Sequence, residues 1–156
     1  MTTPAMALLA AASLAGAGAA SSQSPDIHVL HAWSRPIPPG APAGAGYMTL
    51  VNDSGHPVKL IGGASPAART VEVHEMTLNG GVMRMRPVAG GLVVPAHGRV
   101  ALQPGAYHLM LISPDHAYRL GEHIPVTLRL EGAPSISVDL IVQAGENAPM
   151  SATETN

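Results

Sequence analysis

Hydrophobic and polar residues alternate along the chain in short segments separated by turn-forming residues. A period of two is typical of a strand with one buried face. The pattern predicts strands at 27–33, 47–51, 58–61, 71–78, 81–86, 91–95, 99–102, 107–112, 124–130 and 135–142. The last two are predicted to form a hairpin, and the Pro- and Gly-rich stretches 34–46 and 62–69 are predicted to be loops. No helical period follows residue 26, so the sequence predicts an all-β sandwich.

The stretch 71–86 predicts a β-hairpin that places several metal-binding side chains on one face. Asn79-Gly80 is a strong signal for a two-residue hairpin turn, because a type I′ turn needs positive φ at both central residues. With that turn, His74 lies directly opposite Met85 and Met76 lies opposite Met83. One imidazole and three thioethers would then share a face of the hairpin.

A second register of the same hairpin is open at this stage. If Gly80-Gly81 forms the turn instead, Met76 lies opposite Met85 and His74 lies opposite Pro87. We expect the first register, with His74 facing Met85.

A later strand carries a second pair of candidate ligands. His108 and Met110 are two residues apart, so they point to the same side of a strand, while Leu109 points to the other side. Thioether sulfur and imidazole suit Cu(I) better than Zn²⁺, Mg²⁺ or Ca²⁺. The two segments together predict a soft-metal site with two histidines and two methionines.

Composition narrows the possible functions further. The chain has 156 residues, enough for one domain with a hydrophobic core, and its net charge is −2 with no basic patch, so nucleic acid is not an expected partner. It contains no Cys, which excludes a disulfide, a zinc-thiolate site, a cysteine nucleophile and a blue-copper centre. Because it contains no Phe and one Trp, we expect Val, Leu, Ile, Ala and Met to fill the core.

The ends of the chain differ from its centre. Residues 1–20 are Ala-rich and apolar and end near Ala17-Gly18-Ala19, which is typical of a secretory signal peptide, although no Lys or Arg precedes the apolar run. We expect a linker at 21–26, a β-sandwich domain at 27–144 and a polar, disordered tail at 145–156. A disordered N-terminal tail is the alternative to the signal peptide.

The spacing of the candidate ligands resembles the signature of the periplasmic PCuAC-type copper chaperones. His74 is followed after ten residues by Met85, and His108-x-Met110 follows after another twenty-two. The segments 32–36, 80–83 and 104–110 are also similar to that family, and the resemblance covers residues 27–143.

The resemblance implies a cupredoxin-like Greek-key β-sandwich that binds one Cu(I) and delivers it to an acceptor for assembly of the copper centre of cytochrome c oxidase. The implied ligands are His74, Met85, His108 and Met110. It also implies a periplasmic protein, which we expect to be a monomer without a membrane span after processing. Met76 and Met83 flank this site on the same face. We expect them to shield it, and the alternatives are that they substitute as ligands or simply pack.

Other functions have little support in the sequence. Gly44-Ala45-Gly46 precedes a strand, which is the wrong context for dinucleotide binding, and the chain has no Gly-x-Ser-x-Gly elbow. We therefore expect a binding protein rather than an enzyme, and we expect Glu72 and Glu75 to be solvated strand residues. The alternative function is a metal-free β-sandwich interaction module in which the methionines only pack.

Overall fold

The computed structural model describes residues 26–145, and these residues form strands, turns and loops without a helix. The ten strands are β1 (Ile27–Ser34), β2 (Ala43–Asn52), β3 (Val58–Ser65), β4 (Ala68–Asn79), β5 (Val82–Pro87), β6 (Leu92–Val94), β7 (Gly98–Leu102), β8 (Tyr107–Pro114), β9 (His123–Glu131) and β10 (Ile136–Val142). The predicted signal peptide, all but the last residue of the predicted linker, and the predicted tail from residue 146 onward lie outside the described residues. Within the described residues, no helix is long and apolar enough to cross a membrane.

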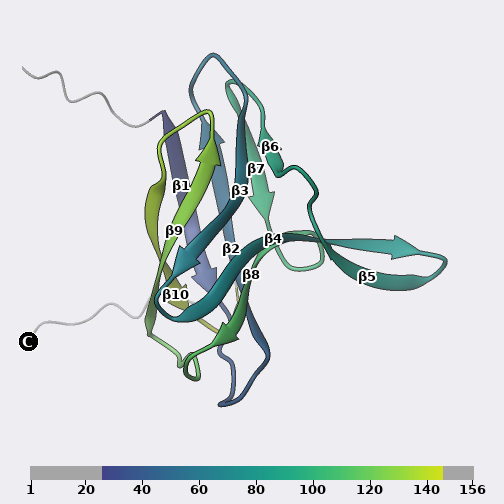
Figure 1. Cartoon of the computed structure of the whole chain (residues 1–156), viewed down its shortest axis with the longest axis vertical. Coiled ribbons are helices and arrows are strands. Elements are labelled where there is room, and N and C mark those ends of the chain that lie inside the picture. Colours follow the sequence, from purple (N-terminus) through teal and green to yellow (C-terminus); the bar gives the residue numbers. More distant parts are fainter. Residues whose placement is uncertain (1–25, 146–156) are drawn as a thin grey trace, which may run out of the picture.

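The strands form one sheet that closes on itself. Its order is β5-β4-β8-β2-β1-β10-β9-β3-β6, with β7 paired to β2 beside this path. An additional pairing between β3 and β4, each next to an end of the path, closes the barrel. The β4–β5 hairpin continues beyond this barrel and projects away from it (Figure 1). The predicted all-β sandwich is therefore confirmed, and the predicted hairpin of β9 and β10 is observed.

Two of the predicted loops are partly strand. β2 begins at Ala43 rather than at Tyr47, because Ala43–Gly46 pairs with β8. The glycines there pack closely against neighbouring side chains: a Cβ atom on Gly46 would lie 2.8 Å from Leu140 Cδ1, so the leucine side chain would have to shift. A Gly-rich segment can thus be a buried strand where a neighbouring side chain fills the space that its own side chain would take.

The same reason extends β3 to Ser65, where a loop was predicted from residue 62. A Cβ atom on Gly63 would lie 2.8 Å from the backbone oxygen of Thr127 on β9. Gly63 also pairs with Val71 on β4, at the pairing that closes the barrel. The absence of a side chain therefore allows β3 to fit between β4 and β9.

The core consists mainly of aliphatic side chains, as expected from the composition. Its fully buried members include Leu50, Leu60, Leu109, Leu111, Leu128 and Leu140. Tyr118 closes one side of the core, where its hydroxyl donates a hydrogen bond to the carbonyl oxygen of Ala67 at 2.9 Å. Burial raises the pKa of Tyr118 to about 12. Met48 is the one methionine among the described residues that belongs to the buried core.

Candidate metal centre

The β4–β5 hairpin adopts the register that we did not favour. Met76 pairs with Met85, Leu78 with Met83, and His74 with Pro87. The expectation that His74 lies directly opposite Met85 was therefore wrong. Met85 lies opposite Met76, two residues further along β4 than His74. Because side chains alternate along a strand, Met85 is still on the same face as His74.

The turn explains this register. Gly80 and Gly81 have φ angles of 59° and 78°, the positive values that both central residues of a type I′ turn need. An Asn79-Gly80 turn would put an L side chain in the left-handed region, whereas two glycines adopt it without steric cost. Asn79 instead pairs with Val82 at the end of the strand.

The structure brings the two predicted histidines together across β4 and β8. His74 pairs directly with His108, and Glu72 pairs directly with Met110. The ring centroids of the two histidines lie 6.0 Å apart. Both histidines are buried, while Met110 is half-buried. His74, His108 and Met110 thus occupy one continuous face of β4 and β8, and Met85 extends that face onto β5.

A backbone carbonyl fixes the tautomer of His108. Its Nδ1 lies 3.2 Å from the carbonyl oxygen of Ala106, which can only accept a hydrogen bond. Nδ1 must therefore carry the proton, which leaves the lone pair of the neutral ring on Nε2. The same oxygen also accepts the backbone N–H of Met76 at 3.1 Å, so one carbonyl holds both strands of the site.

A carboxylate fixes the opposite tautomer in His74. Its Nε2 lies 2.8 Å from Glu72 Oε2, and an ionised carboxylate only accepts, so Nε2 donates and the lone pair is on Nδ1. Nδ1 is buried and has no hydrogen-bond partner among the described residues. A buried acceptor without a partner costs free energy, and a metal ion would satisfy it.

Glu72 was missed as part of the site, since the sequence suggested only a solvated strand residue. Its position two residues before His74 could have indicated this role, because that spacing places both side chains on one face of a strand. Glu75 has a different role, because its Oε1 accepts a hydrogen bond from Arg86 Nε at 2.8 Å on the opposite face.

The surroundings of His108 favour its neutral form. Burial is the main cause and lowers the pKa of His108, and the charge that His74 can carry lowers it further. The hydrogen bond to Ala106 acts in the other direction. A histidine must be neutral to bind a metal ion, so the lowered pKa keeps Nε2 available at neutral pH.

The chemistry of this face fits a soft cation. Within residues 26–145, no group of three or more His, Asp or Glu side chains is arranged to hold a metal ion. The neutral donors on this face are instead the imidazole nitrogens of His74 and His108 and the thioethers of Met110 and, on the adjoining hairpin, Met85. Such a set suits a soft, singly charged ion. Met85 is 48% exposed, so this side of the face is open to solvent.

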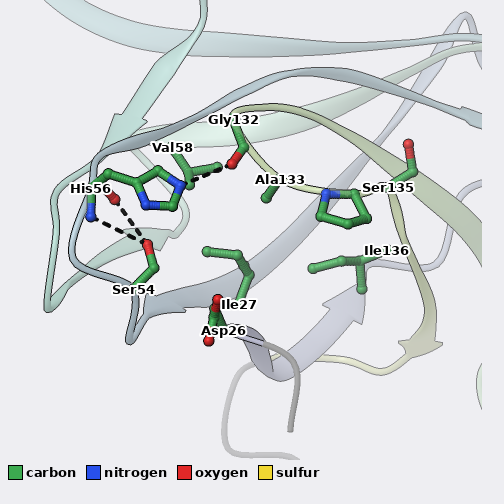
Figure 2. Close-up of a pocket in the computed structure, with 10 residues that line it drawn as sticks. Asp26, Ile27, Ser54, His56, Val58, Gly132, Ala133, Ser135 and Ile136 are labelled. Atoms are coloured by element: carbon green, nitrogen blue, oxygen red, sulfur yellow. Dashed lines mark hydrogen bonds between the residues drawn. The ribbon is translucent and has the colours of Figure 1, made fainter. Parts of the chain in front are cut away.

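A separate cavity of about 320 Å³ lies at another end of the barrel (Figure 2). It is formed by the start of β1 and by the β2–β3 and β9–β10 turns, without residues of β4, β5 or β8. His56 bonds the carbonyl oxygen of Gly132 at 3.0 Å, and Ser54 Oγ bonds the backbone of His56. These polar groups link the two turns to each other, which indicates a structural role.

A third cluster joins the ends of the loop after β8. Both ring nitrogens of His116 are hydrogen-bonded, Nδ1 to Asp115 and Nε2 to Glu122. The bonds to Glu122 and Asp115 raise the pKa of His116 above its ordinary value of 6.5. With both nitrogens occupied, this histidine acts as a cation that bridges two carboxylates.

The stability contribution of His116 should depend on pH. Because its pKa is raised in the folded state, its contribution is complete below 6.5 and is lost as pH rises through the folded-state pKa. In His116→Gln this loss should be absent. Thermal melts of both proteins across this pH range measure the difference, and a constant gap between them would contradict the role of the cluster.

Comparisons with known proteins assign the chain to a protein family. A sequence profile of the family described as "Putative lipoprotein LpqE-like" matches residues 27–142. The chain belongs to the LpqE-like family. A relative from Leifsonia xyli, "Putative lipoprotein Lxx21020", is 29% identical over 115 residues, covering 74% of this chain and 68% of the relative. The protein RP573 of Rickettsia prowazekii is 26% identical over 118 residues, and the match spans 65% of its length.

Solved structures with the same fold include PCuAC domains. The copper-bound PCuAC domain from PmoF2 is 27% identical to this LpqE-like protein with a TM-score of 0.63, covering 76% of this chain and 93% of that domain. The solution structure of the Cu(I) form of DR1885 from Deinococcus radiodurans is 31% identical with a TM-score of 0.61, covering 83% and 84%. The predicted resemblance to PCuAC-type proteins is therefore confirmed.

Proposed function

We propose that this LpqE-like protein is a copper metallochaperone that binds one Cu(I) with His74, Met85, His108 and Met110 and delivers it to an acceptor protein. The observation that carries the proposal is the buried Nδ1 of His74, which has no partner among the described residues and belongs to a ring 6.0 Å from that of His108. The copper-bound PmoF2 domain and Cu(I)-bound DR1885 share the fold and support the choice of metal.

The donor set suits a carrier better than a catalyst. Four neutral ligands leave a Cu(I) complex with a charge of +1, and thioether sulfur favours the reduced ion. The exposed Met85 lets the ligands of an acceptor approach the metal from the hairpin side. The proposed role is therefore to hold and transfer Cu(I), with no catalytic residue assigned.

The proposed destination is the copper centre of cytochrome c oxidase, reached after export to the periplasm. The signal-like residues 1–20 and the family of lipoproteins support export. The resemblance to PCuAC-type chaperones supports the oxidase as the destination. Transfer of Cu(I) from the loaded protein to the isolated copper-binding domain of the oxidase, followed under anaerobic conditions, tests this step.

Metal selectivity tests the proposed function most directly. Anaerobic titration should show one tightly bound Cu(I), and an equimolar amount of Zn²⁺ should not displace it, because thioethers bind the harder ion poorly. Competition with a Cu(I)-specific chelator measures the affinity. Failure to bind Cu(I) would favour the metal-free interaction module, and equal competition by Zn²⁺ would contradict the thioether ligands.

Replacing Glu72 with Gln should weaken Cu(I) binding by about tenfold, within the range for loss of a group that orients a metal-binding histidine. A glutamine can donate its amide N–H to Nε2 of His74, which favours the tautomer with the proton on Nδ1 and blocks that atom from the metal. Anaerobic chelator competition measures the change.

Glu75→Gln is the matched control for Glu72→Gln. It removes the same charge from a neighbouring residue whose carboxylate binds Arg86 rather than His74. It should leave the affinity for Cu(I) close to that of the original protein. Equal affinities of the two variants would show that Glu72 does not orient His74.

A further inference from the structure

Three methionines share one face of the projecting hairpin. Met76 and Met85 form a direct pair, and Met83 lies two residues before Met85 on β5. Since side chains alternate along a strand, all three point to the same side of the ribbon as His74. By this register, the methionines continue the row that begins at the histidine pair and extend it along the hairpin, which projects from the barrel (Figure 1).

Packing does not explain the two methionines of β5, Met83 and Met85. Met83 and Met85 are 50% and 48% exposed, and all six residues of β5 are exposed. A methionine that fills a core is buried, as Met48 is, because burial of its apolar surface provides the stabilisation. At 50% and 48% exposure, Met83 and Met85 forgo about half of that stabilisation.

Charge on the hairpin is arranged so that this face stays neutral. Arg84 and Arg86 alternate with the methionines along β5 and therefore point to the other side of the ribbon. Arg86 is held there by Glu75, at 2.8 Å. The thioether face carries no cation that would repel a positively charged metal ion.

We infer that Met76, Met83 and Met85 form a second, weaker Cu(I) site made of thioethers alone, through which the ion passes between the hairpin tip and the histidine pair. This inference rests on the proposed function, since it assumes that the histidines hold the tightly bound ion. Opposed residues have Cβ atoms roughly 4.5–5.5 Å apart, and diagonal neighbours roughly 7–8 Å. The three rotatable bonds of methionine let neighbouring sulfurs approach a shared ion.

The two sites are expected to differ in strength for a chemical reason. Imidazole is a stronger donor than a thioether, so the set with two histidines retains the ion while the three-thioether set exchanges it. Met85 belongs to both sets, because it pairs with Met76 and shares a face with His74. An ion can therefore move from one set to the other without leaving all of its ligands.

The test is an anaerobic Cu(I) titration of the full-length protein labelled with ¹³C in its methionine methyl groups, with peaks assigned by single Met→Leu variants. The first equivalent should shift the methyl of Met110, and further equivalents should shift those of Met76 and Met83. Met83→Leu keeps the size of the side chain and removes the sulfur. It should weaken the second binding event by about tenfold and leave the first unchanged.

Leu78→Met is the matched gain-of-function variant, because it adds a thioether directly opposite Met83. It should strengthen the second binding event. If the first equivalent binds but later ones shift no hairpin methyl, or if Met83→Leu changes nothing, the second site is refuted and the proposed function stands. If the first equivalent fails to perturb Met110 or either histidine, the proposed function itself fails.

Discussion

Replacing His108 with alanine is expected to lower the affinity for Cu(I) by more than about 100-fold. Loss of a group that merely orients a ligand costs 10- to 100-fold in metal affinity, and His108 would supply a metal bond directly. Its Nε2 is the free nitrogen of a ring fixed by Ala106, and no third histidine shares the face within the described residues. His74→Ala should have a comparable effect, because it removes the buried Nδ1.

The methionines should rank below the histidines and differ from each other. Met110→Ala should cost more than Met85→Ala, because Met76 lies directly opposite Met85 and can replace its sulfur. His28→Ala is the control, since His28 lies on β1 and pairs with Asp53 at 2.9 Å. Anaerobic competition titrations measure all of these variants. Unchanged affinity in both His74→Ala and His108→Ala would refute the copper site.

Replacing Leu109 with alanine is expected to lower the free energy of unfolding by about 2–5 kcal/mol, the usual cost of removing a fully buried leucine side chain. Leu109 lies between His108 and Met110 on β8, yet its side chain is completely buried in the core on the other side of the strand. Urea and thermal melts of the metal-free protein measure the loss.

The affinity of Leu109→Ala for Cu(I) should change little at a temperature where the variant is still folded, because the leucine faces away from the site. Met110→Ala is the matched control on the neighbouring residue, and it should lose affinity with a smaller loss of stability. If the two variants lose the same stability, the division of β8 into a core face and a site face is wrong.

Local sequence patterns predicted the strands well and their pairing less well. Alternation identified the segments, because burial of one face requires a period of two. The same rule could not show that Gly46 and Gly63 lie in strands, since a glycine has no side chain to reveal its face. Their role depends on Leu140 and Thr127, which are distant in sequence.

For the candidate site too, local features were predicted from the sequence, whereas contacts between strands were not. The spacing of His108 and Met110 placed them on one face, as the structure shows them. The hairpin register could not be settled, because Asn79-Gly80-Gly81 contains two possible two-residue turns and local rules allow both. The direct pairing of His74 with His108, and the bonds to Glu72 and Ala106, depend on how β4 meets β8, which no local pattern contains.

The arginines of β5 have a consequence for the solubility of the protein. β5 is an edge strand, and an exposed edge offers unpaired backbone groups to the strand of another molecule. A hairpin with exposed Leu78, Val82 and Met83 would be prone to edge-to-edge aggregation if it were uncharged. Arg84 and the Arg86–Glu75 ion pair place charged groups along this edge, which disfavours its pairing with another copy. The charges that leave the thioether face free are thus also expected to disfavour edge-to-edge pairing of the protruding hairpin with another copy.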